Sequence, residues 1–309
     1  MGLTENQKNL IQAISKNDMV SAKKCALSCI TEDNTQKNKY WCSRYKSILE
    51  NSKNMIELPY DLKNIICVED VSTSFREERY FLTDREKGVY DDIIRMKEIS
   101  ERLAEIGLSY KNSTLLYGES GTGKTTFGKY AAYKIGVPFC YLNFSNLVDS
   151  HMGSTSKNIS RAFSYAILNP CVLMLDEIDC ISIRRAKISG ETGGEMARVT
   201  ITLMQEFDKL PNDSVVIGAT NRIDMIDEAL LRRFSLKHEI KSLTEKESRI
   251  ATQKFLDDIN MVVQNKDIEE LLVKSNGNQA NLINGLIKMV SKNIYYELIR
   301  EKSRRLLTQ

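Results

Sequence analysis

A glycine-rich segment that ends in lysine and threonine carries the clearest chemistry in this sequence. Residues 118–126 read GESGTGKTT and fit the spacing G-x-x-x-x-G-K-[ST]. Glycines at these positions let consecutive backbone N–H groups approach phosphate oxygens, and a helix N-terminus directly behind them favours anions. Lys124 is then expected to reach the β- and γ-phosphates of a nucleotide, and the Thr125 hydroxyl to bind Mg²⁺. The predicted phosphate-binding residues are Gly118, Glu119, Ser120, Gly121, Thr122, Gly123, Lys124, Thr125 and Thr126.

A pair of carboxylates follows an apolar run further along the chain. Residues 171–175 read CVLML and lead directly into Asp176 and Glu177. A buried strand of this kind delivers acidic side chains to the carboxyl edge of a parallel sheet, where a P-loop ligand also lies. We expect Asp176 to hold Mg²⁺ and Glu177 to polarise the attacking water. The next apolar run, 214–219, leads to Asn221, whose amide can orient that water or contact the γ-phosphate.

Alternating strand and helix signals surround these residues. Apolar runs of strand length alternate with runs of helical periodicity, which predicts an α/β fold with a parallel five-stranded sheet and helices on both faces. The predicted strands cover residues 114–117, 139–143, 171–175, 214–219 and a short segment near His238, and the predicted helices between them cover 127–135, 156–168, 195–210 and 227–232.

The flanking segments read as helical. Residues 1–54 predict a small N-terminal helical segment, and residues 55–240 the α/β unit, with a connector over 55–74. Within it, 82–107 reads as one long helix or two adjacent ones, with a capping box at Thr83 and Glu86 and an end at Gly107. Residues 241–309 predict a helical lid with helices over 245–256, 268–274, 280–291 and 294–307.

Composition limits the class of protein. The 309 residues are 28% charged and 7% aromatic, which describes a globular chain, and the net charge of +3 is too small to indicate nucleic-acid binding by itself. No apolar run approaches the roughly 18 residues that span a bilayer, and the N-terminus lacks an apolar signal core, so we expect no membrane association and a cytoplasmic location. The seven cysteines lack a zinc-type spacing and read as structural.

Three motifs together resemble one family. GESGTGKT, LMLDEID and IGATNRIDMIDEALLRRF, in this order, look like the AAA family of AAA+ ATPases, the last of them in the form seen in the katanin and spastin group. The resemblance implies a P-loop NTPase fold with a lid, hydrolysis of ATP with Mg²⁺, a homo-oligomeric ring, in this family a hexamer, and action on a protein client. It makes Asn221 sensor 1, and Arg232 and Arg233 arginine fingers for the neighbouring subunit's nucleotide, with Arg198 a further interface residue.

The sequence departs from the family pattern in two places. His151, Met152 and Gly153 stand at the tip of the first pore loop, where the family usually has an aromatic and an apolar residue before the glycine. At the predicted lid helix, Gln279 and Asn281 replace the small and acidic residues of the family.

The sequence leaves three interpretations open, and the missing pore aromatic motivates the second of them. The first is a ring-forming remodeller or unfoldase, and the second is a nucleotide-dependent switch or scaffold with little threading. The third is a DNA-associated loader, which would use the basic residues Arg184, Arg185, Lys187, Lys302, Arg304 and Arg305. No H-E-x-x-H signature or catalytic triad is present, so we expect no proteolysis by this chain itself.

Overall fold

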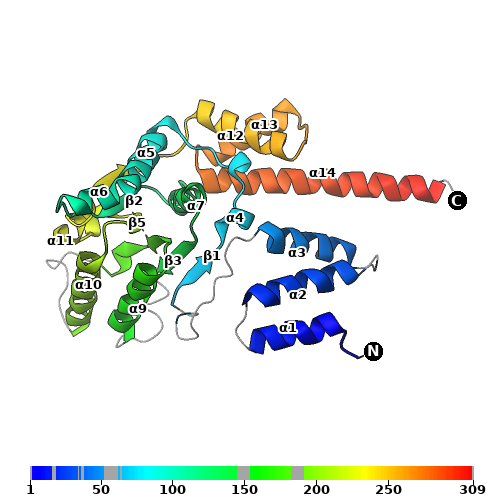
Figure 1. Cartoon of the computed structure of the whole chain (residues 1–309). Helices are drawn as coiled ribbons and strands as arrows, with labels where there is room; N and C mark the ends of the chain where they lie inside the picture. Colours follow the sequence, from blue (N-terminus) through cyan, green and yellow to red (C-terminus); the bar gives the residue numbers. More distant parts are fainter. Residues whose placement is uncertain are drawn as a thin grey trace.

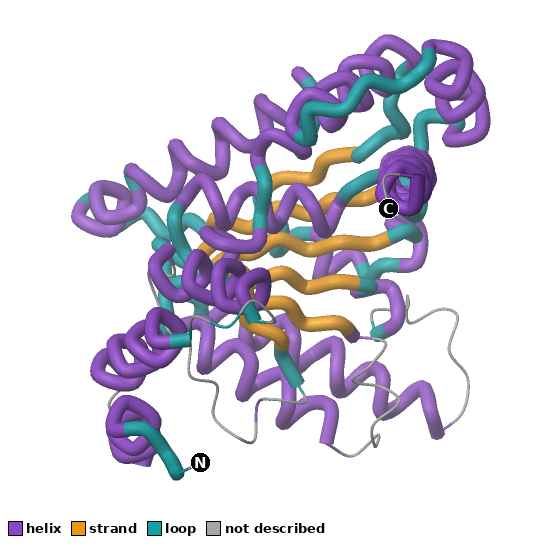
Figure 2. Tube along the Cα trace, turned by 90° about the vertical axis from the view of Figure 1, so that its right-hand side faces the viewer, coloured by secondary structure: helices purple, strands orange, loops and turns teal. Residues whose placement is uncertain are grey.

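A six-stranded sheet forms the centre of the molecule. The computed structural model describes residues 2–15, 19–33, 35, 38–51, 62, 65–144, 154–181 and 191–307. Figure 2 shows the strands lying side by side. The strand order is β1-β3-β4-β5-β2-β6, with all neighbours parallel except β1 and β3. The strands are β1 (Cys67–Glu69), β2 (Asn112–Tyr117), β3 (Phe139–Asn143), β4 (Val172–Asp176), β5 (Val215–Thr220) and β6 (Leu236–Glu239).

The five predicted parallel strands are confirmed, and β1 is an addition that the sequence did not indicate. This strand lies in the predicted connector and pairs antiparallel with β3 at the edge of the sheet. Its three residues, CVE, are too few to show the alternation of apolar and polar side chains that identifies a strand. The connector therefore extends the sheet beside β3.

Helices cover both faces of the sheet, as predicted. Successive β4 side chains point to opposite faces, so Val172 and Met174 join one apolar core while Leu173 and Leu175 join the other. Helices α5 and α7 pack in the first core, and α9 and α10 in the second (Figure 1). The bounds of the helices in this part are α4 (Val71–Ser74), α5 (Asp84–Glu98), α6 (Ser100–Glu105), α7 (Lys124–Ile135), α9 (Thr155–Leu168), α10 (Glu191–Lys209) and α11 (Glu228–Leu231).

The predicted start and end signals of the 82–107 region are present in the structure. Thr83 and Glu86 form the capping box at the start of α5, and the region divides into α5 and α6. Gly107, which follows α6, has a positive φ of 75°, a conformation that favours glycine.

The C-terminal helices have an apolar core of their own. Helices α12 (Glu245–Asp258), α13 (Asn265–Ser275) and α14 (Gln279–Leu307) surround a cluster that includes Leu256, Leu272 and Leu286. The sequence predicted separate helices over 280–291 and 294–307, which is wrong, because one helix runs through both. No proline or glycine interrupts the chain between those two runs. Figure 1 shows α14 projecting well beyond the other C-terminal helices.

Three N-terminal helices lie side by side, apart from the sheet. They are α1 (Glu5–Ser15), α2 (Met19–Glu32) and α3 (Lys39–Asn51), and α3 is the one nearest to α4 (Figure 1). The predicted break at Asn17 and Asp18 lies outside the described residues. None of the helices in the described ranges is both long enough and apolar enough to span a bilayer.

Several contacts join the C-terminal helices to the α/β part of the chain, and two of them differ in kind. In the first, which we call the backbone clamp, the segment after β6 runs between two glycines. Gly118 (φ 141°) faces the Ile240 carbonyl and Gly277 (φ 72°) faces the Leu243 carbonyl so closely that a Cβ atom would overlap either oxygen. The backbone N–H of Ile240 donates to the Tyr117 carbonyl (2.7 Å), and that of Leu243 to the Gly277 carbonyl (2.8 Å).

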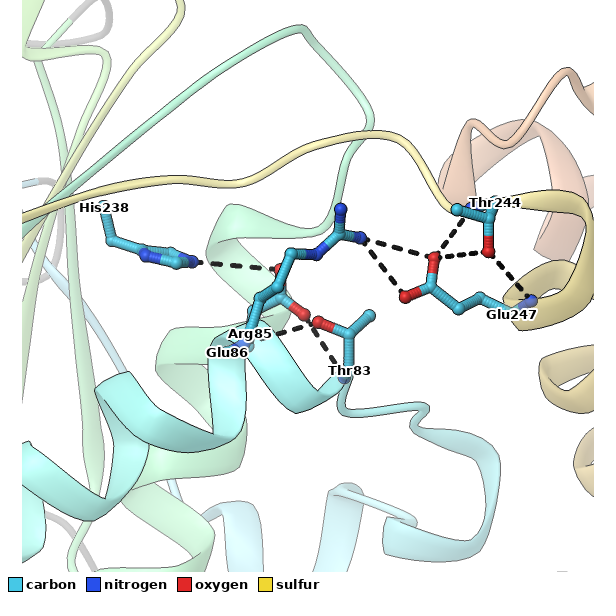
Figure 3. Close-up of polar contacts among 6 residues, drawn as sticks. All are labelled: Thr83, Arg85, Glu86, His238, Thr244 and Glu247. Carbon is cyan, nitrogen blue, oxygen red and sulfur yellow. Dashed lines mark hydrogen bonds and ion pairs between the residues drawn. The ribbon is translucent and has the colours of Figure 1, made fainter.

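The second contact, which we call the polar bridge, is made of side chains (Figure 3). Thr244 and Glu247 form a capping box at the start of α12, and Arg85 in the first turn of α5 lies 3.3 Å from both carboxylate oxygens of Glu247. On the other side of Arg85, the buried Glu86 faces His238 of β6, with 4.0 Å between Oε1 and Nε2.

Candidate functional site

The glycine-rich segment forms the turn between β2 and α7, as its sequence predicts. Gly121 (φ 79°) and Gly123 (φ 101°) adopt left-handed conformations, and Gly123 is the N-cap of α7. The loop also lies against the start of α14. The Asn278 amide donates to the Ser120 carbonyl (2.8 Å), and the Ala280 N–H donates to the Gly121 carbonyl (3.0 Å). A Cβ atom at 121 or 123 would meet the end of the Asn278 or Gln279 side chain, which would have to shift, so the glycines allow this close approach as it stands.

Lys124 is buried at the base of this loop. Its ammonium donates to the carbonyls of Gly118 (2.9 Å) and Glu119 (2.7 Å) and to Asn221 Oδ1 (2.9 Å). Burial lowers the pKa of Lys124, and the nearby Asp176 and Asp179 oppose that shift. The structure therefore brings together the predicted lysine and the predicted sensor amide, which are far apart in the sequence.

Thr125 and Asp176 also meet. The Thr125 hydroxyl donates to Asp176 Oδ2 at 2.8 Å, and the Glu177 N–H donates to Oδ1 at 2.9 Å. Hydroxyl and carboxylate oxygens are the ligand atoms that Mg²⁺ prefers, so this pair fits the ion. Among the described residues, no group of three or more histidine, cysteine, aspartate or glutamate side chains is placed to hold a metal ion.

Glu177 has an unusual backbone conformation for a non-glycine residue. Its φ of 56° and ψ of 42° are left-handed, and it caps the short 3-10 helix Ile178–Cys180. Strained conformations of this kind cluster at functional sites. Its carboxylate makes no hydrogen bond or ion pair with any other described side chain and faces the same cavity as Asp176 and Asn221.

These side chains line one cavity of about 430 Å³. That size suits a small organic ligand. One wall comes from the loop, α7 and the ends of β4 and β5, and the other from residues 79–81 before α5, from Leu243 and from the C-terminal helices. Sequence reasoning did not identify most of the second wall, because its residues are scattered and follow no motif. They are Arg79, Tyr80, Phe81, Leu243, Ala251, Gln279, Ala280, Leu282, Ile283 and Asn284.

The two predicted arginine fingers lie away from this cavity and differ from each other. Arg232 has an 81% exposed side chain and a long 4.0 Å ion pair to Glu228. Arg233 is 30% exposed and binds both carboxylate oxygens of Asp208 at 3.1 and 3.0 Å, and also the Ala229 carbonyl. Within its own chain, therefore, neither arginine reaches the candidate site, and only Arg233 is held firmly.

Other predicted residues are not brought to the site. His151, Met152 and Gly153, together with Arg184, Arg185 and Lys187, lie outside the described residues, as do the side chains of Lys302, Arg304 and Arg305. Arg198 lies on α10 with an exposed side chain.

The α/β part of the chain matches a known family. Residues 114–242 fit the family described as "ATPase family associated with various cellular activities (AAA)". The chain is 37% identical over 150 residues to the peroxisomal ATPase PEX6 of Saccharomyces cerevisiae, which covers 47% of this chain and 14% of that protein. It is 32% identical over 179 residues to the 26S proteasome subunit RPT4 of the same yeast, covering 55% and 41%.

Two further similarities agree with this match. An ATP-dependent zinc metalloprotease, FtsH 3 of Symbiobacterium thermophilum, is 33% identical over 170 residues, or 50% of this chain and 27% of that protein. The chain thus spans well under two thirds of each of these relatives. The crystal structure of the FIGL-1 AAA domain superposes with a TM-score of 0.56 at 21% identity, covering 73% of this chain and 76% of that one. That likeness shows the fold.

Proposed function

We propose that this chain, which contains a domain of the AAA ATPase family, binds Mg²⁺-ATP in the cavity between α7 and α14 and hydrolyses it in a ring of identical subunits. One observation carries the proposal. Lys124, Thr125, Asp176, Glu177 and Asn221 come from three separate segments, and all of them line the same cavity. This is the set of groups that phosphoryl transfer requires: a phosphate ligand, metal ligands, a base and an orienting amide.

Each residue has a role that its surroundings support. Bound Mg²⁺-ATP supplies the phosphoanhydride and the divalent charge that favours its cleavage. The Lys124 ammonium exchanges its carbonyl partners for phosphate oxygens, and Thr125 and Asp176 hold the metal. Glu177 accepts a proton from water, while Asn221, released from Lys124, orients that water.

A second subunit completes the proposed site. Among the described residues, the exposed Arg232 makes only the long 4.0 Å ion pair to Glu228, and it is suited to stabilise charge on a neighbour's phosphate. Arg233, through Asp208 on α10, fixes the turn that presents it. We therefore assign Arg232 the direct contact and Arg233 the support of that contact.

The test mixes two inactive variants. Glu177→Gln lacks the base, and Arg232→Ala lacks the trans arginine, so each alone should bind ATP with little turnover. In a head-to-tail ring an Arg232→Ala subunit beside a Glu177→Gln subunit has a complete site, so an equal mixture should recover about a quarter of wild-type ATPase activity. Wild-type-like turnover by Glu177→Gln alone would contradict the assignment of the base. No recovery on mixing would contradict the shared site.

The cycle is proposed to act on a protein partner, the client class that the family resemblance implies. The same ATPase assay with added unfolded protein separates this activity from an assembly switch. Stimulation that His151→Ala or Met152→Ala abolishes supports threading, whereas indifference to both favours the switch. Salt-sensitive DNA binding would instead support a loader.

A further inference from the structure

Strand β3 ends in polar side chains that the phosphate-binding motifs do not include. Tyr141 and Asn143 are two residues apart, so they lie on the same face of the strand, and Asn143 is directly opposite Asp176 in the β3–β4 register. The face they share is the one covered by α7, on which the phosphate-binding loop begins. Both side chains are thus placed beside the metal-binding carboxylate.

The Tyr141 hydroxyl reaches that carboxylate. It donates to Asp176 Oδ2 at 3.3 Å, and its own oxygen accepts a hydrogen bond from the Asn143 amide at 3.1 Å. Because Asn143 donates to the phenol oxygen, the phenol proton is left for Asp176. The Tyr141 ring is half-buried and stacks on Phe139, with 6.1 Å between ring centroids, which fixes the direction of the hydroxyl.

Asp176 therefore has three donors within the described residues, and they differ in what they can do. The Thr125 hydroxyl, at 2.8 Å, is itself a predicted metal ligand, so it is shared with the ion when the ion binds. The Glu177 N–H, at 2.9 Å from Oδ1, and the Tyr141 hydroxyl are not metal ligands. These two donors remain to hold the carboxylate plane, and Tyr141 is the one that acts on Oδ2.

We propose that Tyr141, backed by Asn143, is a positioning residue that orients Asp176 for Mg²⁺. The inference rests on the proposed nucleotide site and adds to it a group outside the family motifs. Partners that orient a ligating carboxylate raise metal affinity without touching the metal. A phenylalanine at this position would pack on Phe139 equally well, so the orientation of Asp176 depends on the hydroxyl group.

The experiment uses Tyr141→Phe, which removes only that hydroxyl. Binding of Mn²⁺ in the presence of a non-hydrolysable ATP analogue, followed by EPR on the full chain, should weaken about tenfold. The Mg²⁺ concentration for half-maximal ATPase should rise by about the same factor, while kcat at saturating Mg²⁺ stays within about twofold. Analogue affinity in EDTA and the thermal midpoint should not change.

Two further variants separate positioning from packing. Tyr165→Phe removes a hydroxyl from another half-buried tyrosine, which packs in the core on the opposite face of the sheet, and should leave Mn²⁺ affinity unchanged. Asn143→Ser weakens the support behind the phenol and should shift Mn²⁺ affinity in the same direction by a smaller factor.

Unchanged Mn²⁺ affinity in Tyr141→Phe overturns the inference while the nucleotide site stands. An equal loss in Tyr165→Phe also overturns it, because the effect would then be general. If the wild-type chain with analogue binds no Mn²⁺ at all, the proposed function itself fails, and the inference fails with it.

Discussion

The backbone clamp and the polar bridge join the same helices to the same sheet by different means. In the clamp, peptide groups approach so closely that Gly118 and Gly277 leave no room for a Cβ atom. In the bridge, long side chains meet across a partly solvated gap, with Arg85 39% and Glu247 22% exposed. Close packing transmits small displacements, whereas a solvated ion pair adjusts to them.

From this difference we expect the clamp, and not the bridge, to influence the shape of the cavity. Both glycines of the clamp lie beside cavity residues, since Gly118 opens the phosphate-binding loop and Gly277 is two residues before Gln279. The bridge includes none of the residues that line the cavity. We therefore expect substitutions in the clamp to change both stability and nucleotide binding, and substitutions in the bridge to change stability alone.

The largest effect is expected from Gly277→Ala. The new methyl group would overlap the Leu243 carbonyl, and alanine is also strained at a φ of 72°. The free energy of unfolding should therefore fall by about 2 kcal/mol or more. Urea unfolding and ATP-analogue affinity measure the two consequences. The matched control is Gly107→Ala, with a φ of 75° and nothing within 4 Å, which bears the conformational strain alone. Equal losses in both variants would show that the close approach does not matter.

Substitutions at the two capping boxes are expected to change the free energy of unfolding by intermediate amounts and in opposite directions. Burial raises the pKa of Glu86 above its ordinary value of 4.5. The folded state therefore holds this proton more tightly than the unfolded chain, and stability is lost as pH rises from 4.5 through the folded pKa. Glu86→Gln keeps the cap but removes the charge, so it should stabilise the protein by about 1 kcal/mol at neutral pH. The gain should disappear near pH 4.

Glu247→Gln is the matched variant at the other box. Burial raises the pKa of Glu247, but hydrogen bonds from Thr244 and the charge of Arg85 outweigh burial and hold the pKa below 4.5. Its stabilising contribution is present above pH 4.5 and is lost as pH falls through the folded pKa. Glu247→Gln should therefore destabilise the protein at neutral pH and leave its stability unchanged at acidic pH. Thermal midpoints across pH 4–8 that moved in the same direction for both variants would refute the distinction.

The smallest effect is expected from Arg85→Ala. A partly exposed ion pair contributes little, so the free energy of unfolding should fall by about 0.5 kcal/mol and ATP-analogue affinity should stay the same. The loss should shrink in about 1 M salt, where charges are screened. A change in nucleotide affinity would show that the bridge, like the clamp, shapes the cavity.

The parts of the fold and of the candidate site that short motifs encode could be predicted from the sequence. The loop, the carboxylate strand and Asn221 each combine an apolar run with residues of fixed spacing, and the structure brings Lys124, Thr125, Asp176 and Asn221 together. The capping box at Thr83 was found for the same reason, since its four-residue pattern is local.

Contacts between distant segments were not predictable in this way. The Tyr141 hydroxyl meets Asp176 only because β3 and β4 pair in one register, and Gln279 meets Gly123 only because α14 begins beside the loop. The difference between Arg232 and Arg233 depends on Asp208, which lies on α10, 25 residues before Arg233. Two adjacent arginines cannot be told apart in a sequence, because their roles depend on side chains that only the fold brings near.

Helix α14 connects the cavity to a distant part of the molecule. Its first turn lines the site through Gln279 and Ala280, and its 29 residues continue without interruption to Leu307. A rigid helix of that length measures about 43 Å, so a tilt of about 10° at the nucleotide end would sweep the far end through roughly 7 Å. A small movement of the first turn of α14 at the phosphate-binding loop would therefore become a larger movement of its C-terminal end, which projects from the body of the molecule (Figure 1).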